Sequence, residues 1–261
     1  MRGRAAALGA GTVLNALSTG VGSAFAIDVE TTATVELDDS GSVTGTIAEA
    51  DDADTGLIER CVELGIATYG DGDASGGTVR TESDVPMAAG LKSSSAAANA
   101  AVLATADAVG ADPDPLSACR LGVRAARETG VTVTGAFDDA SASMLGGVTV
   151  TDNAEDDLLA HDEVAWDALV WTPDERAYSA DADAERCANV APMAELVEDL
   201  AVEGRYAAAM TVNGLAFSAA LGFSADHAVE AMPHAAGVSL SGTGPSVVAV
   251  GTRDGLDRVA D

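Results

Sequence analysis

The chain has 261 residues, of which 13 are lysine or arginine and 42 are aspartate or glutamate, so its formal net charge is −29. This charge excludes a protein that binds nucleic acid or an anionic membrane through a generally basic surface. Because 48% of the residues are hydrophobic, the chain can bury a core and is not a disordered acidic tail.

The charges are distributed unevenly among the residue types. The acids are 27 aspartates and 15 glutamates, whereas the bases are 12 arginines and one lysine, Lys92. An aspartate-rich surface with almost no lysine keeps a protein hydrated in concentrated salt, where screening weakens the mutual repulsion of its charges. The composition is therefore typical of a halophilic protein.

The first half of the chain alternates between strand and helix patterns. In chain order, the predicted elements are a hairpin of strands at 25–37 and 43–47, a helix from residue 54 or 55 to about 68, a strand at 78–82, a helix at 93–109, a helix from Pro115 to Gly130, and strands at 131–137 and 148–151. The helix at 93–109 is a run of small helix formers, and Asp114 is suited to cap the helix that Pro115 begins.

The acidic segment at 151–162 is the best candidate for a boundary, which divides the chain into halves at 1–151 and 152–261. Beyond it, the pattern predicts a strand at 165–171, two or three helices between residues 182 and 232, and strands at 238–240 and 247–250. Strands and helices do not follow the regular alternation of a doubly wound sheet, so the predicted fold class is α+β.

The N-terminal 26 residues resemble a signal peptide, but glycines and polar residues interrupt the apolar stretch. A secreted acidic structural protein stays open as an alternative. The sequence contains no run of 18 or more continuous apolar residues, so no membrane-spanning helix is predicted. The three cysteines and three histidines have neither disulfide nor metal-site spacing.

The strongest chemical signal is the glycine-containing loop at 86–92, which leads directly into the helix at 93–109. Free backbone N–H groups at a helix start bind anions, and serine hydroxyls extend such a site. Lys92 lies in this loop, although a serine-rich helix cap with a chance lysine is the alternative. No G-x-x-x-x-G-K-[ST] motif occurs, which excludes a P-loop kinase. A second glycine loop lies at 240–246.

The pattern P-x-x-x-G-L-x-S-S-[SA] at 86–95, with Ser-Gly-Thr-Gly-Pro at 241–245, resembles the second and third signature motifs of the GHMP small-molecule kinases. Within that superfamily, segments at 9–16, 90–100 and 134–140 resemble the archaeal-type shikimate kinases. The resemblance extends from residue 9 to about 251. It implies the GHMP kinase fold, a single two-lobed unit with an N-terminal half like ribosomal protein S5 and a ferredoxin-like C-terminal half.

The resemblance also implies ATP and Mg²⁺ as cofactors. The implied ATP-binding residues are Pro86, Met87, Ala88, Ala89, Gly90, Leu91, Lys92, Ser93, Ser94, Ser95 and Ala96, with Gly242, Thr243 and Gly244. Ser93 and Glu128 are the implied metal ligands, and their oxygen donors suit Mg²⁺. The alternative for Glu128 is an i,i+4 ion pair with Arg124.

The implied catalytic residues are Asp139, Asp138 and Lys92. Glu128 precedes Asp139 by eleven residues, a spacing that relatives show between a metal-binding glutamate and the base, so Asp139 is favoured as the base and Asp138 as a supporting residue. Which of the two acids is the base stays open. Lys92 would supply positive charge to the phosphates.

The implied reaction is ATP-dependent phosphorylation of the 3-hydroxyl of shikimate, a cytoplasmic step towards chorismate and the aromatic amino acids. Homoserine kinase, mevalonate kinase and a non-catalytic binding protein of the same fold are the alternatives. A bidentate arginine is expected at the shikimate carboxylate, and the candidates are Arg4, Arg124, Arg127 and Arg176. No nucleic-acid or membrane partner is expected.

Overall fold

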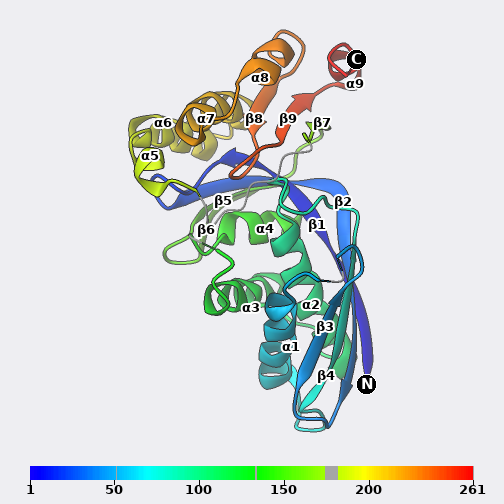
Figure 1. The fold of residues 1–261 in the computed structure, drawn as a ribbon. Coiled ribbons are helices and arrows are strands. Elements are labelled where there is room, and N and C mark those ends of the chain that lie inside the picture. The colour runs from blue at the N-terminus through cyan, green and yellow to red at the C-terminus, as the bar shows by residue number, and fades with distance from the viewer. Residues whose placement is uncertain (51, 133, 174–181, 261) are drawn as a thin grey trace.

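The computed structural model describes residues 1–50, 52–132, 134–173 and 182–260, and two β-sheets organise this part of the chain (Figure 1). The larger sheet consists of β1 (Arg2–Leu14), β2 (Val21–Asp38), β3 (Val43–Ile47), β4 (Gly76–Ser83), β5 (Val148–Asp152) and β6 (Asp157–Asp162). Its order is β3-β4-β2-β5-β6, with β1 also paired to β2. The smaller sheet has the order β7-β9-β8, from β7 (Asp167–Trp171), β8 (Gly237–Leu240) and β9 (Val247–Gly251).

The helices form two groups (Figure 1). The first packs against the larger sheet and contains α1 (Gly56–Tyr69), α2 (Ser93–Val109), α3 (Pro115–Glu128) and α4 (Phe137–Leu145). The second lies near the smaller sheet and contains α5 (Ala184–Ala188), α6 (Ala191–Val202), α7 (Tyr206–Leu221), α8 (Asp226–Ala231) and α9 (Arg253–Leu256). The predicted α+β class is confirmed.

Helix α2 explains why the core is built from small side chains. It has the predicted bounds 93–109 and packs against β1 and β2. Ala96, Ala100 and Ala104 are fully buried, and a Cβ atom at Gly3 of β1 would overlap the backbone of Ala104. Small residues on both elements let the helix approach the sheet closely, which a larger core residue would prevent.

The glycine-rich N-terminal segment forms strands that the sequence did not predict. Ala10, Val13 and Leu14 of β1 are fully buried, and Gly11 faces the ring of Phe25 across the β1–β2 pair. Interior glycines weaken the strand pattern because they carry no side chain, yet here they provide room for close packing. The signal-like stretch is therefore part of β1 and β2 in the larger sheet.

The hairpin predicted from strands 25–37 and 43–47 is wrong, although both strands exist. β4 lies between β2 and β3, and β3 pairs with β4 in parallel. Helix α1 makes the crossover connection from β3 to β4 that a parallel pair requires. The short acidic turn after β2 therefore leads into β3, although β2 and β3 do not pair with each other.

The strand predicted at 131–137 is also wrong. Residue 133 lies outside the described residues, and none of the others belongs to a strand. Gly135 and Ala136 have φ angles of 89° and 52°, which end any extended run and turn the chain into α4. Phe137 begins that helix and is fully buried beside Cys119 and Val123. The β-branched residues at 131–134 favoured a strand, but the turn at Gly135 and Ala136 that leads into α4 overrides this local propensity.

The second half matches its predicted strands within two residues, but four helices, α5 to α8, replace the expected two or three. The second half of the acidic segment at 151–162 forms β6, which pairs with β5 in the larger sheet. The division into halves at residues 151 and 152 stays a prediction. Over the described residues, no helix combines the length and apolar character that crossing a bilayer requires.

Candidate active site

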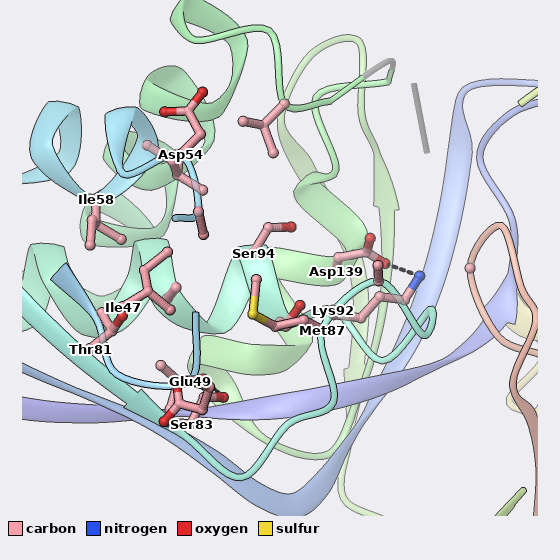
Figure 2. Close-up of a pocket in the computed structure, with 18 of the residues that line it drawn as sticks. Ile47, Glu49, Asp54, Ile58, Thr81, Ser83, Met87, Lys92, Ser94 and Asp139 are labelled. Carbon is pink, nitrogen blue, oxygen red and sulfur yellow. Dashed lines mark hydrogen bonds and ion pairs between the residues drawn. The ribbon is translucent and has the colours of Figure 1, made fainter. Parts of the chain in front are cut away.

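A cavity of about 500 Å³ opens between the first helices and the larger sheet (Figure 2). Ile47 and Ile58 lie at one end together with Asp54 and Glu49, and Lys92 with Asp139 lies at the other. A cavity that combines apolar side chains with a few polar groups at one end and a lysine at the other suits a ligand with an aromatic base and an anionic tail.

The predicted loop at 86–92 and the first turn of α2 border this cavity. Lys92 is the N-cap residue of α2 and adopts a left-handed conformation, with φ 65° and ψ 32°. Its side chain makes no cap hydrogen bond, while Ser93 and Ser94 line the cavity directly after it. The backbone N–H groups and hydroxyls at this helix start provide donors for an anion. A non-glycine residue held at positive φ is strained, and such strain is concentrated at functional sites.

The two glycine loops contact each other. The Ser241 hydroxyl donates to the Gly90 carbonyl at 2.8 Å, and a Cβ atom at Gly90 would overlap the backbone of Ser241. The Gly242 N–H donates to the Thr12 hydroxyl at 2.7 Å, and the Asn15 amide donates to the Gly242 carbonyl at 2.8 Å. Thr12 and Asn15 therefore hold the second glycine loop, at 240–246, from the side of β1. No local pattern in the sequence indicated this role.

Lys92 forms an ion pair with Asp139, and the Nζ–Oδ1 distance is 2.8 Å (Figure 2). The exposed fractions of the two side chains are 8% and 17%, so water screens the pair only weakly. The structure thus brings the single lysine into contact with one of the two predicted catalytic acids. This ion pair joins the start of α2 to the first turn of α4 at the cavity.

Asp138 has a different environment, although it adjoins Asp139 in the first turn of α4. Burial and, next in size, the neighbouring charge of Asp139 raise the pKa of Asp138 to about 7, although Lys92 and the Asn153 amide oppose the rise. Asn153 Nδ2 donates to Asp138 Oδ1 at 2.7 Å. Asp138 therefore has a raised proton affinity, which suits a carboxylate that takes up a proton near neutral pH.

A second, smaller cavity of about 50 Å³ adjoins the first. Its polar lining includes Asn15, Thr132 and Thr134 as well as both aspartates. Four residues line both cavities: Lys92, Asp139, Gly242 and Thr243. Asp138 lines the smaller cavity and is not among the residues that border the larger one. The described site therefore has two compartments with the lysine and an aspartate between them.

The structure does not place Glu128 on either cavity. Its Oε1 atom lies 2.8 Å from Arg124 Nε and its Oε2 atom 2.6 Å from Arg60 Nε. These hydrogen bonds hold the pKa of Glu128 below its usual value. The i,i+4 ion pair that the sequence left open is present, and the metal role of Glu128 stays a prediction.

The predicted carboxylate-binding arginines are not in the described lining either. Arg124 pairs with Glu128, and Arg127 binds Asp156 through both terminal nitrogens, at 2.6 and 2.7 Å. Arg4 is an exposed residue of β1. Arg176 lies outside the described residues.

The donors at the cavities fit a magnesium–nucleotide complex. The Ser93 hydroxyl and the Asp139 carboxylate are hard oxygen donors at the charged end, and no group of three or more His, Cys, Asp or Glu side chains suited to a metal occurs among the described residues. Mg²⁺ binds proteins in this manner, through one or two oxygen ligands together with substrate phosphates and water. A dedicated cage of protein ligands is not required.

Comparison with known proteins shows similarity over the whole chain. The family description "GHMP kinases N terminal domain" matches residues 56–147. The chain is 65% identical over 263 residues to a shikimate kinase of Halobacterium salinarum, covering 100% of this chain and 92% of that protein. It is 51% identical over 252 residues to a shikimate kinase of Methanosarcina mazei, covering 96% and 85%.

Two solved structures are similar in fold. Mevalonate kinase of Methanococcus jannaschii has a TM-score of 0.75 at 12% identity, covering 99% of this chain and 93% of that one. Homoserine kinase of Cytophaga hutchinsonii has a TM-score of 0.71 at 17% identity, covering 99% and 89%. The fold that the motifs implied is therefore confirmed. At such low sequence identity, the similarity does not indicate the substrate.

Proposed function

The chain belongs to the shikimate kinase family, and from this membership we propose that its two cavities hold ATP and shikimate, with phosphoryl transfer where they meet. The reaction is ATP-dependent phosphorylation of the 3-hydroxyl of shikimate, on the route to chorismate and the aromatic amino acids. One observation carries the assignment of the compartments, namely that Lys92, Asp139, Gly242 and Thr243 line both. Because ATP is made and maintained in the cytoplasm, we place the reaction there.

ATP occupies the larger cavity in this proposal. Its base lies against Ile47, Ile58 and Met87, and its phosphates extend towards Ser93 and Lys92. The N-terminus of α2 and Lys92 supply local positive potential. A protein with a net charge of −29 repels a polyanion at long range, so these short-range groups have to provide the attraction.

Mg²⁺ would be held by the Ser93 hydroxyl together with the phosphate oxygens of ATP. When bound, it would neutralise charge on the β- and γ-phosphates. Both Glu128 oxygens are paired with Arg60 and Arg124. Glu128 would therefore bind Mg²⁺ only if it gave up these ion pairs.

Shikimate occupies the smaller compartment, where Asn15, Thr132 and Thr134 offer hydrogen-bonding groups to its ring hydroxyls. The Asp138 carboxylate accepts the proton of the attacking 3-hydroxyl. The alkoxide oxygen then bonds to the γ-phosphorus as the bond from that phosphorus to the bridging oxygen of ADP breaks. Lys92 faces the negative charge that moves onto ADP.

This assignment of the base reverses the preference drawn from sequence spacing. The Asp139 carboxylate is engaged by Lys92, with an Nζ–Oδ1 distance of 2.8 Å. The pKa of Asp138, about 7, matches the pH at which a general base works best. Asp139 serves instead to hold Lys92 at the boundary between the compartments.

The test is an acceptor comparison with the purified protein in concentrated KCl. Shikimate, homoserine and mevalonate are offered separately with MgATP, and ADP release is measured in a coupled assay. We expect shikimate-dependent turnover and no turnover above background with the other two alcohols. Turnover of homoserine or mevalonate without turnover of shikimate would contradict the proposal. The Asp138→Asn variant serves as a control for contaminating kinases.

A further inference from the structure

Helix α4 begins without a cap of its own, although its first turn carries both aspartates. Its N-cap residue is Ala136, which has φ 52° and no capping side chain. Asn153, the first residue after β5, replaces the missing cap. Its Oδ1 atom accepts a hydrogen bond from the backbone N–H of Asp138 at 3.0 Å.

The same amide also holds the carboxylate, since Asn153 Nδ2 donates to Asp138 Oδ1 at 2.7 Å. Thr151 determines which end of the amide faces which partner, because its hydroxyl donates to Asn153 Oδ1 at 2.7 Å. The amide oxygen therefore meets two donors, and the amino group is left to face the carboxylate.

The backbone of Asn153 is anchored on both sides. Its N–H donates to the Gly20 carbonyl at 3.0 Å, and its carbonyl accepts from Arg127 at 2.9 Å. Arg127 is in turn fixed by Asp156. Only 1% of the Asn153 surface is exposed, so the residue is a buried connection between the β1–β2 turn, β5 and α3.

Gly22 limits the other side of the Asp138 carboxylate. It pairs with Thr151 across β2 and β5, and a Cβ atom built on it would overlap Asp138 Oδ2. The carboxylate thus lies between the bare backbone of β2 and the Asn153 amide. This leaves little freedom for rotation of the Asp138 side chain.

We infer that Asn153 is a positioning residue, which fixes the Asp138 carboxylate in the orientation that accepts the proton of the substrate hydroxyl. The inference rests on the proposed function because it takes Asp138 as the base. Proton transfer requires donor and acceptor within hydrogen-bond reach, and a displacement of about 1 Å can lower the rate about 100-fold. A purely structural alternative is that Asn153 only caps α4.

The Asn153→Asp variant separates these two roles. Aspartate caps a helix as well as asparagine does, and it keeps an oxygen for the Asp138 N–H and the Thr151 hydroxyl. The variant lacks the amino group that holds Asp138 Oδ1. In its place, a second carboxylate faces the Asp138 carboxylate. We therefore expect kcat to fall about 10- to 100-fold, while KM for ATP stays within about twofold because the nucleotide loop is untouched.

Two further variants control for loss of stability. Asn153→Ala removes both the cap and the contact with the carboxylate, so kcat and the melting temperature both fall. Thr105→Val removes a buried hydrogen bond from Thr105 to Ala101 inside α2, so the melting temperature falls and kcat does not change. Unchanged kcat in Asn153→Asp would overturn the inference, as would a fall in kcat for Thr105→Val that matches its loss of stability.

A crystal structure of Asn153→Asp distinguishes failure of this inference from failure of the proposed function. If the wild-type protein does not phosphorylate shikimate, the proposed function fails. The positioning role is then judged from the orientation of Asp138. A rotated Asp138 side chain in the variant supports the role, and an unchanged side chain overturns it.

Discussion

Replacing Asp138 with asparagine is expected to lower kcat by about 10²- to 10⁴-fold, the contribution typical of a general base. Asparagine keeps the shape and the Oδ1 acceptor for Asn153 but cannot take the proton of the 3-hydroxyl. Because Asp138 lines the smaller cavity, where we propose that shikimate binds, and is not among the residues of the larger cavity proposed for ATP, the affinity for ATP should change by less than about threefold. Steady-state kinetics and calorimetric titration with ATP measure the two effects.

The pH dependence follows from the raised pKa of Asp138. The base acts only when ionised, so kcat/KM of the wild-type protein should fall about tenfold per unit below pH 7 and level off above it. Asp139→Asn is the matched comparison. It removes the neighbouring negative charge that raises the pKa of Asp138, so the acidic limb should move to lower pH. If the Asp138→Asn variant were active and the Asp139→Asn variant inactive, Asp139 and not Asp138 would be the base.

Stability should change in the opposite direction to activity in the Asp138→Asn variant. The pKa of Asp138 rises from 3.8 to about 7 on folding, so the folded state keeps its proton where the unfolded chain has lost it. This carboxyl therefore lowers the stability of the wild-type protein as pH rises from about 4 to about 7. The asparagine variant avoids this cost and should melt at a higher temperature than the wild type at pH 8. Inactivity then cannot be attributed to unfolding.

The second large effect is expected for Lys92→Met, which keeps the length of the side chain and removes its charge. In the proposed arrangement the site loses the positive group that faces the phosphates, so kcat should fall about 10²- to 10³-fold. Asp139 also loses its partner at 2.8 Å. Because Lys92 lowers the pKa of Asp138, that pKa should rise in the variant and the acidic limb of kcat/KM should move to higher pH.

Arg80→Met is the matched control for Lys92→Met. It removes one positive charge from the same protein at an exposed position on β4, where Arg80 pairs with Glu82 at 3.1 Å. Exposed ion pairs of this kind contribute little to stability. If both variants lose activity equally, the effect comes from the total charge of the protein and not from the place of Lys92 in the loop.

Local features explain which elements the sequence predicted. The run of alanines from Ser93 to the stop at Gly110, and the Asp114 cap of α3, are determined by neighbours in the chain, and the structure has both. The loop at 86–92 could be singled out for the same reason, because its glycine, serine and lysine residues are contiguous. Such signals need no knowledge of which strands pair.

Contacts distant in sequence explain what was missed. The burial of Asp138 depends on Gly22 of β2 and on Asn153 after β5, and these residues meet only because β2 pairs with β5. A glycine in a glycine-rich segment and an asparagine in an acidic turn carry no individual signal. The spacing from Glu128 favoured Asp139 because a sequence shows adjacency and not burial, whereas the two aspartates differ in their environment.

A crystal structure with a non-hydrolysable ATP analogue, Mg²⁺ and shikimate tests the arrangement of the two compartments most directly. We expect the γ-phosphate beside Lys92 and the 3-hydroxyl of shikimate within about 2.6–3.2 Å of the Asp138 carboxylate, with Asp139 still paired to the lysine. Shikimate bound in the larger cavity, or a 3-hydroxyl that contacts Asp139 and not Asp138, would contradict the proposed arrangement.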